Sequence, residues 1–191
     1  NPQQPTWDEF TAACNALVKA GIPPLAIGNG DQWPGVQWMW SFEARFGGNQ
    51  AFYDAVSGQN GGAYNSAPML KAAEYTQMLN KNGWLTRGFN GISGSDKYTM
   101  WTTGKGSMIF QGTWLLGYTL TAPEGFDFGF FNFPSFPNEN PEFQGLVMAG
   151  TDALFVSKSS KNPEAAAEFL NGLADPQRAT DFAVQTANIT V

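Results

Sequence analysis

Helix signals alternate with short apolar runs along this chain, and that alternation limits the folds open to it. The apolar runs include residues 22–28, 107–111 and 153–157. Helices that alternate with short buried strands are typical of α/β architecture, in which helices cover mostly parallel strands. We therefore predict an α/β fold, with ligand binding beyond the carboxyl ends of the strands. The predicted helices begin near Thr6, Pro34, Ser66, Ser95, Asn162 and Asp175.

The first helix has the clearest signals. Thr6 and Glu9 have the spacing of a capping box, and Gly21 is a typical stop. Its apolar face, which should be buried, consists of Trp7, Phe10, Cys14 and Leu17. Farther along, the glycine pair at 47–48 separates two helical stretches, and the polar segment 138–145 is a candidate boundary between structural units.

The composition excludes several classes of function. The net charge is −6, which is the wrong sign for binding to nucleic acid. The chain has no histidine, which excludes Ser-His-Asp and Cys-His catalysis and any metal site that uses histidine. Cys14 cannot form an internal disulfide and fits a buried, inert position. With 14% charged and 15% aromatic residues, the chain favours a neutral, aromatic recognition surface.

Residues 105–117, KGSMIFQGTWLLG, place a tryptophan where the chain turns from a predicted strand into a helix. If 107–111 is a central strand, Gln111, Gly112 and Trp114 lie at its carboxyl end, and Gly112 leaves the backbone room to turn. Trp114 is then expected to face a ligand crevice. Gln111 could bind ligand there or could equally satisfy a backbone group.

Five segments, in order, resemble the extracellular solute-binding proteins of ABC importers, in particular the carbohydrate-binding family related to maltose-binding proteins. They are PTWDEF, GKGSMIFQGTWLLG, FPSFP, VMAGTDALFVS and SKNPEAAAEFLNGL. The resemblance implies two α/β lobes with a sugar in the cleft between them, no catalysis and no cofactor. It implies that residues 1–145 form most of the C-terminal lobe and 146–191 a segment returning to the N-terminal lobe, the rest of which is absent from this sequence.

The resemblance also implies site residues and partners. Trp114 matches an aromatic residue that stacks on sugar in this family, and Trp38 falls where a second one is often placed. Gly150 and Asp152 match a loop that approaches the ligand from the other lobe, and Trp33 is a weaker candidate from its loop position. The implied partners are a carbohydrate and the permease subunits of an ABC transporter. We expect a monomer outside the cytoplasm, either periplasmic or lipid-anchored at the outer face of the membrane.

Two alternatives use the same sugar-stacking chemistry. A glycoside hydrolase would need two carboxylates flanking the bond, and we see no recognisable pair at predicted strand ends. We expect Glu43, Asp127 and Glu142 to be solvated or paired at the surface. A lectin or carbohydrate-binding module should be all-β, which the helix signals contradict.

Overall fold

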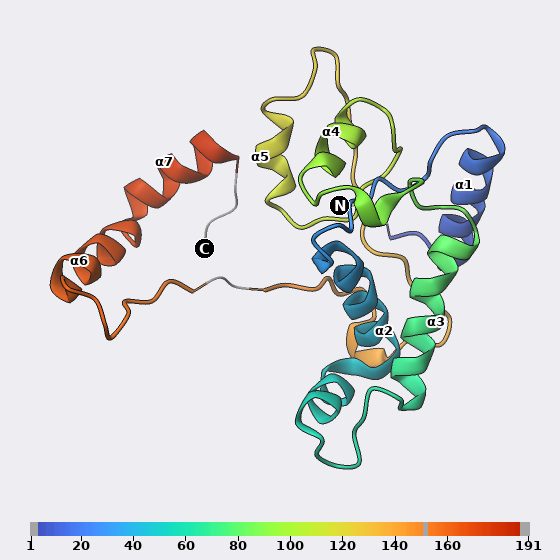
Figure 1. The fold of residues 1–191 in the computed structure, drawn as a ribbon, viewed down its shortest axis with the longest axis horizontal. Coiled ribbons are helices and arrows are strands. Elements are labelled where there is room, and N and C mark those ends of the chain that lie inside the picture. The colour runs from blue at the N-terminus through green and yellow to red at the C-terminus, as the bar shows by residue number, and fades with distance from the viewer. Residues whose placement is uncertain (1–3, 151–152, 188–191) are drawn as a thin grey trace. The chain divides into compact units, whose positions relative to one another are not determined.

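The computed structural model describes residues 4–150 and 153–187. The chain divides into two units (Figure 1). The first consists of residues 1–110 and 123–148, and the second of residues 111–122 and 149–191. Helices α1 (Trp7–Lys19), α2 (Trp33–Ser57), α3 (Ala67–Lys81), η1 (Phe89–Gly91), α4 (Asp96–Thr102) and η2 (Pro141–Phe143) belong to the first unit, and α5 (Leu115–Thr119), α6 (Pro163–Leu173) and α7 (Pro176–Thr186) belong to the second.

Helix α1 begins where the sequence predicts. The Thr6 hydroxyl accepts from the Glu9 N–H at 3.2 Å, and the Glu9 carboxylate accepts from the Thr6 N–H at 2.8 Å. This reciprocal capping box satisfies donors that a helix start leaves free. Cys14 is fully buried on the apolar face, and burial raises the pKa of its thiol to about 12. The prediction of a buried thiol is confirmed.

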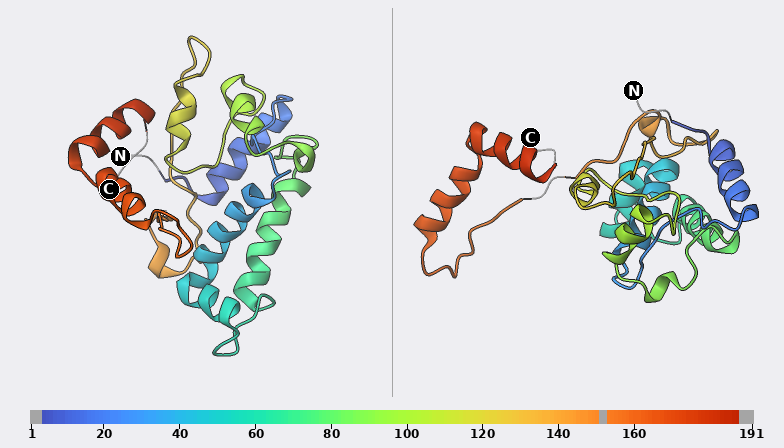
Figure 2. Two further views of the ribbon diagram at one scale, coloured as in Figure 1. Left: turned by 60° about the vertical axis from the view of Figure 1, so that its left-hand side comes forward. Right: turned by 90° about the horizontal axis from the view of Figure 1, so that it is seen from above.

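Helices α2 and α3 lie side by side in the first unit (Figures 1 and 2). Helix α2 is broken at Gly48, whose φ of 70° and ψ of 178° are not helical. A residue with a side chain rarely adopts that φ, so glycine allows the break. The two helical stretches predicted on either side of the glycine pair are therefore present as one interrupted helix.

The predicted strands are shorter than expected. Leu25 makes isolated parallel bridges to both Leu85 and Met108, so its segment lies between the other two. Ala26 donates to the Met108 carbonyl at 2.8 Å, and Thr86 donates to the Leu25 carbonyl at 3.2 Å. The predicted parallel arrangement is thus present between 22–28 and 107–111, as bridges rather than full strands, and the segment around Leu85 joins it without having been predicted. The predicted strand at 153–157 has no strand or bridge assignment.

Aromatic side chains form the core of the first unit. Trp84 is fully buried, and its Nε1 donates to Oδ1 of Asn15 at 2.9 Å. Trp7 stacks on Phe136 with ring centres 5.0 Å apart, and it meets the edge of Phe42 at 5.6 Å. These pairs have the offset and edge-to-face geometries that aromatic quadrupoles favour.

A buried ion pair connects α2 to the segment around η2. Arg45 lies 3.4 Å from Glu139, and both side chains are almost inaccessible. The Arg45 guanidinium also donates to the carbonyls of Phe143 and Leu146. These acceptors compensate for part of the desolvation of the charge. The segment predicted to be an extended connection is therefore part of the first unit and is held against α2.

Helices α6 and α7 of the second unit begin at the predicted residues. Pro163 and Pro176 each occupy the first turn, and Asp175 accepts from the N–H groups of Gln177 and Arg178 at 3.1 Å. The predicted inward face of α6 is only partly covered, because Ala166 and Leu170 are half-buried while Phe169 and Leu173 are exposed. Among the described residues, no helix combines the length and apolar character that crossing a membrane requires.

Candidate functional site

Trp33 lies beyond the carboxyl end of the middle parallel segment of the first unit. After Leu25 the chain stays extended to Asn29, turns, and enters α2 at Trp33. The residue is 38% exposed. A position beyond the carboxyl ends of parallel strands is where α/β proteins bind ligands. Trp33 therefore offers a partly exposed indole at the predicted location.

Side-chain hydrogen bonds hold the loop before Trp33. Asn29 accepts from the Gly35 N–H at 2.9 Å and donates to Oδ1 of Asn90 at 2.8 Å. Asp31 accepts from the Gly94 N–H at 2.6 Å. These bonds connect the start of α2 to the loops around η1. The position of Trp33 therefore depends on α2 and on those loops.

Trp38 lies in the core of the first unit. It is 6% exposed, and its ring packs 4.8 Å from Phe110 and 5.7 Å from Phe133. In this conformation aromatic neighbours enclose the indole, so it offers no surface on which a sugar could stack. A ligand-binding role for Trp38 stays a prediction that requires the ring to be uncovered.

Trp114 lies in the second unit, at the residue that precedes α5, and is 44% exposed. A Cβ at position 112 would lie 2.2 Å from the Trp114 ring, so the indole folds back on a glycine and no other residue leaves it that space. Both amide atoms of the neighbouring Gln111 side chain are inaccessible and have no hydrogen-bond partner among the described residues. An unpaired buried amide is costly, and a ligand hydroxyl would remove that cost.

The loop predicted to approach the ligand is only partly described. Gly150 has open space around the position of a Cβ. Asp152 lies outside the described residues. Gln111, Gly112 and Trp114 belong to the second unit, where the Trp114 ring lies against Gly112, and Trp33 belongs to the first. Roles for Gly150 and Asp152 stay predictions.

The expectation that Glu43 is solvated or paired at the surface is wrong. Its side chain is buried on α2, Oε2 has no hydrogen-bond partner among the described residues, and burial raises the pKa of the carboxyl. The apolar residues of α2 are distributed over all faces of the helix, so periodicity alone could not predict that Glu43 is buried. Within the described parts of the chain, no group of acidic residues and cysteine could hold a metal ion.

Lys97 is a further residue near Trp33 that the sequence analysis did not identify. It is 1% exposed, and its Nζ lies 3.9 Å from the centre of the Trp33 ring. The helix pattern does indicate that Lys97 is buried, because it is four residues before the buried Trp101 and therefore shares its helix face. A lysine on a buried face indicates a specific contact.

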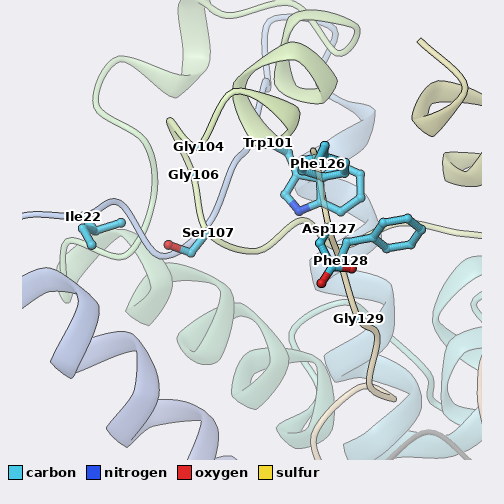
Figure 3. Close-up of a pocket in the computed structure, with 9 residues that line it drawn as sticks. All are labelled: Ile22, Trp101, Gly104, Gly106, Ser107, Phe126, Asp127, Phe128 and Gly129. Carbon is cyan, nitrogen blue, oxygen red and sulfur yellow. The ribbon is translucent and has the colours of Figure 1, made fainter. Parts of the chain in front are cut away.

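The first unit also has a cavity of about 490 Å³ away from these residues (Figure 3). Ile22 precedes the Leu25 segment, and Gly106 precedes Met108, so the cavity lies at the amino ends of the parallel segments. Ligand sites of parallel sheets lie at the other ends. We therefore assign Trp33, and not this cavity, to the candidate site. The lining residues are Ile22, Trp101, Gly104, Gly106, Ser107, Phe126, Asp127, Phe128 and Gly129.

Comparison with known proteins gives one family and several similar folds. A family model described as bacterial extracellular solute-binding protein matches residues 3–179. The comparison with curated proteins gave no match.

Among solved structures, RafE from Streptococcus pneumoniae, in its apo form, is 23% identical with a TM-score of 0.66, over 97% of this chain and 48% of that one. A chitin oligosaccharide binding protein is 27% identical with a TM-score of 0.64, over 70% and 34%. A structure from work on xylan utilization by Caldanaerobius polysaccharolyticus is 24% identical with a TM-score of 0.63, over 71% and 35%. This chain thus spans less than half the length of each.

Proposed function

The chain belongs to the bacterial extracellular solute-binding protein family, and from that premise we propose that it forms part of the substrate-binding component of an ABC importer. Its ligand is a neutral sugar or a small oligosaccharide, held in a cleft between two lobes. The observation that carries this proposal is the half-exposed indole of Trp114, three residues after Gln111, whose side-chain amide is inaccessible and has no hydrogen-bond partner among the described residues.

This pair of groups suits the chemistry of a sugar. A sugar ring has apolar C–H faces that stack on an aromatic ring, and hydroxyl groups at its rim that exchange hydrogen bonds with an amide. In the first unit, the partly exposed indole of Trp33 is a separate aromatic surface with the same stacking chemistry. The low content of charged residues fits a neutral ligand. The name of the chitin oligosaccharide binding protein supports the same ligand class.

The proposed partners follow from the family. Permease subunits of the transporter would receive the sugar from the closed form of the protein, because ligand contacts from two lobes favour closure. We propose a monomer outside the cytoplasm, either in the periplasm or lipid-anchored, with no affinity for nucleic acid. Binding without bond cleavage distinguishes this role from that of a glycoside hydrolase.

The test is calorimetry on the full-length protein with chitobiose, xylobiose and D-galactose. Trp114→Ala should weaken binding by about 1 kcal/mol or more, as expected for an aromatic anchor. Tyr64→Ala is the control, because Tyr64 is also an exposed aromatic residue but lies in the loop between α2 and α3. Unchanged affinity in Trp114→Ala would remove Trp114 from the site. Release of monosaccharide from chitobiose or xylobiose would favour the hydrolase.

A further inference from the structure

Lys97 has an environment that an ordinary surface lysine does not. Its side chain is 1% exposed, and its Nζ has no hydrogen-bond acceptor among the described residues. Burial of an ammonium group without an acceptor is unfavourable, so another interaction must compensate. One such group is the indole of Trp33, whose ring centre lies 3.9 Å from Nζ.

The distance fits a cation–π contact. A lysine within about 6 Å of a ring centre is attracted by the ring's quadrupole, most strongly for tryptophan and more strongly when water is excluded. The Tyr98 ring lies farther from Nζ, at 5.2 Å. The ammonium group therefore occupies one face of the Trp33 ring.

The backbone of Gly94, which Asp31 holds by a hydrogen bond, lies against the edge of the same ring. A Cβ at position 94 would lie 3.1 Å from Nε1 of Trp33 and 2.7 Å from Oδ2 of Asp31, so the indole edge lies against the backbone of this loop. Asp31 binds the Gly94 N–H and also attracts the Lys97 charge. The ring is thus held on one face and one edge, while 38% of the residue remains exposed.

We propose that Lys97 is a positioning residue that holds the indole of Trp33 in place as a stacking surface for the sugar. The inference rests on the proposed function, because it takes Trp33 as a ligand-binding residue. Lys97 itself does not reach the ligand, since its side chain is enclosed. A ring that is already immobile loses less side-chain entropy on binding, which raises affinity without a new contact.

The protonation of Lys97 provides a direct readout of the contact. Burial lowers the pKa of Lys97 to about 8, and Asp31 opposes that shift. Asp31 on the loop before α2 and Tyr98 on α4 are the titratable groups shown to face Nζ. Raising the pH through this value removes the charge from the face of the Trp33 ring and should change the shielding of the indole.

The first experiment uses the full-length protein labelled with 5-fluorotryptophan and no sugar. Trp33→Phe identifies the ¹⁹F resonance of Trp33. We expect this resonance to shift between pH 7 and 9.5 with a midpoint near 8 in the wild type, and to lose that shift in Lys97→Met. A Trp33 resonance that does not move with pH in the wild type, or moves equally in Lys97→Met, would overturn the contact.

The second experiment measures affinity for chitobiose, xylobiose and D-galactose by calorimetry at pH 7. Lys97→Met should weaken binding by about five- to tenfold. In this variant the Trp33 side chain is free before binding, so the sugar must immobilise it at a cost in entropy. Lys97→Arg keeps the cation and should restore most of the affinity. Lys105→Met removes a charge from the exposed loop after α4 and should have no effect.

The outcomes separate the two proposals. Wild-type affinity in Lys97→Met, with the ¹⁹F shift present in the wild type, would overturn the positioning role and leave the proposed function intact. If the wild type binds none of the three sugars, the proposed function fails for them, and the positioning role fails with it even where the ¹⁹F shift proves the contact.

Discussion

The first unit encloses Trp84, Phe42 and Met69, whereas the second leaves Phe155 and Phe169 largely in solvent. Both units contain amphipathic helices with clear caps. Helix caps act locally, so they mark where a helix begins whether or not its apolar face finds a partner. Burial depends on neighbours, and within the second unit the described residues leave Phe169 of α6 exposed. The difference indicates that the first unit supplies most of the stability of this chain.

The largest expected effect comes from Trp84→Ala in the 191-residue chain. Removing a fully buried indole and its hydrogen bond to Asn15 should lower the free energy of unfolding by about 3–5 kcal/mol. The matched change in the second unit, Phe169→Ala, should cost less than about 0.5 kcal/mol because that side chain is already exposed. Urea unfolding followed by tryptophan emission measures both. Similar losses in the two variants would contradict the comparison.

The next effect concerns the ion pair that holds η2 against α2. Glu139→Gln keeps the shape of the side chain but leaves the buried charge of Arg45 without its counterion. We expect a loss of about 3 kcal/mol, at the lower end for a broken buried pair, because two carbonyl groups still accept from the guanidinium. Urea unfolding measures this loss. As a control, Glu164→Gln on exposed α6 should leave stability unchanged.

The helices could be predicted from sequence because their signals are local. Thr6 and Glu9 determine the start of α1, and Asp175 with Pro176 determines the start of α7. The parallel pairing of Leu25 with Met108 was also expected from the short apolar runs, whereas its pairing with Leu85 was not. Each of these predictions depends on residues close in sequence or on a common rule of chain topology.

The environments of individual side chains on α2 could not be predicted. Trp33, Trp38 and Trp40 occur within eight residues, yet only Trp38 is buried. Apolar residues occur on all sides of this helix, so periodicity does not identify its inner face. Lys97 was missed for a related reason, since its enclosure depends on the ring of Trp33, which is distant in sequence.

A smaller effect should separate binding from stability in the second unit. Gly112→Ala would place a Cβ within 2.2 Å of the Trp114 ring and push the indole away. We expect about a tenfold loss of affinity for whichever of chitobiose, xylobiose or D-galactose binds the full-length protein, the order of one misplaced aromatic anchor. Stability should change little, because Trp114 is half exposed. Thr113→Ala, the exposed neighbour, should retain affinity.

The smallest expected effect concerns the pH dependence of stability in the first unit. Burial lowers the pKa of Lys97 from its ordinary 10.5 to about 8. Between these values the unfolded chain binds the proton and the folded chain does not, so this group makes stability rise with pH. Below pH 8 both states are protonated and the folded state bears the full cost of the buried charge.

Comparison of the wild type with Lys97→Met isolates this contribution. The free energy of unfolding of the wild type, relative to that of the variant, should increase on the order of 1 kcal/mol from pH 7 to pH 10. Cys14 acts in the opposite direction above pH 9, because its folded pKa is raised to about 12, but it is common to both proteins and cancels. Urea unfolding at several pH values measures the difference. A relative stability that falls with pH would mean that the Lys97 ammonium is favourably paired in the folded state, and the first unit would then enclose a satisfied charge.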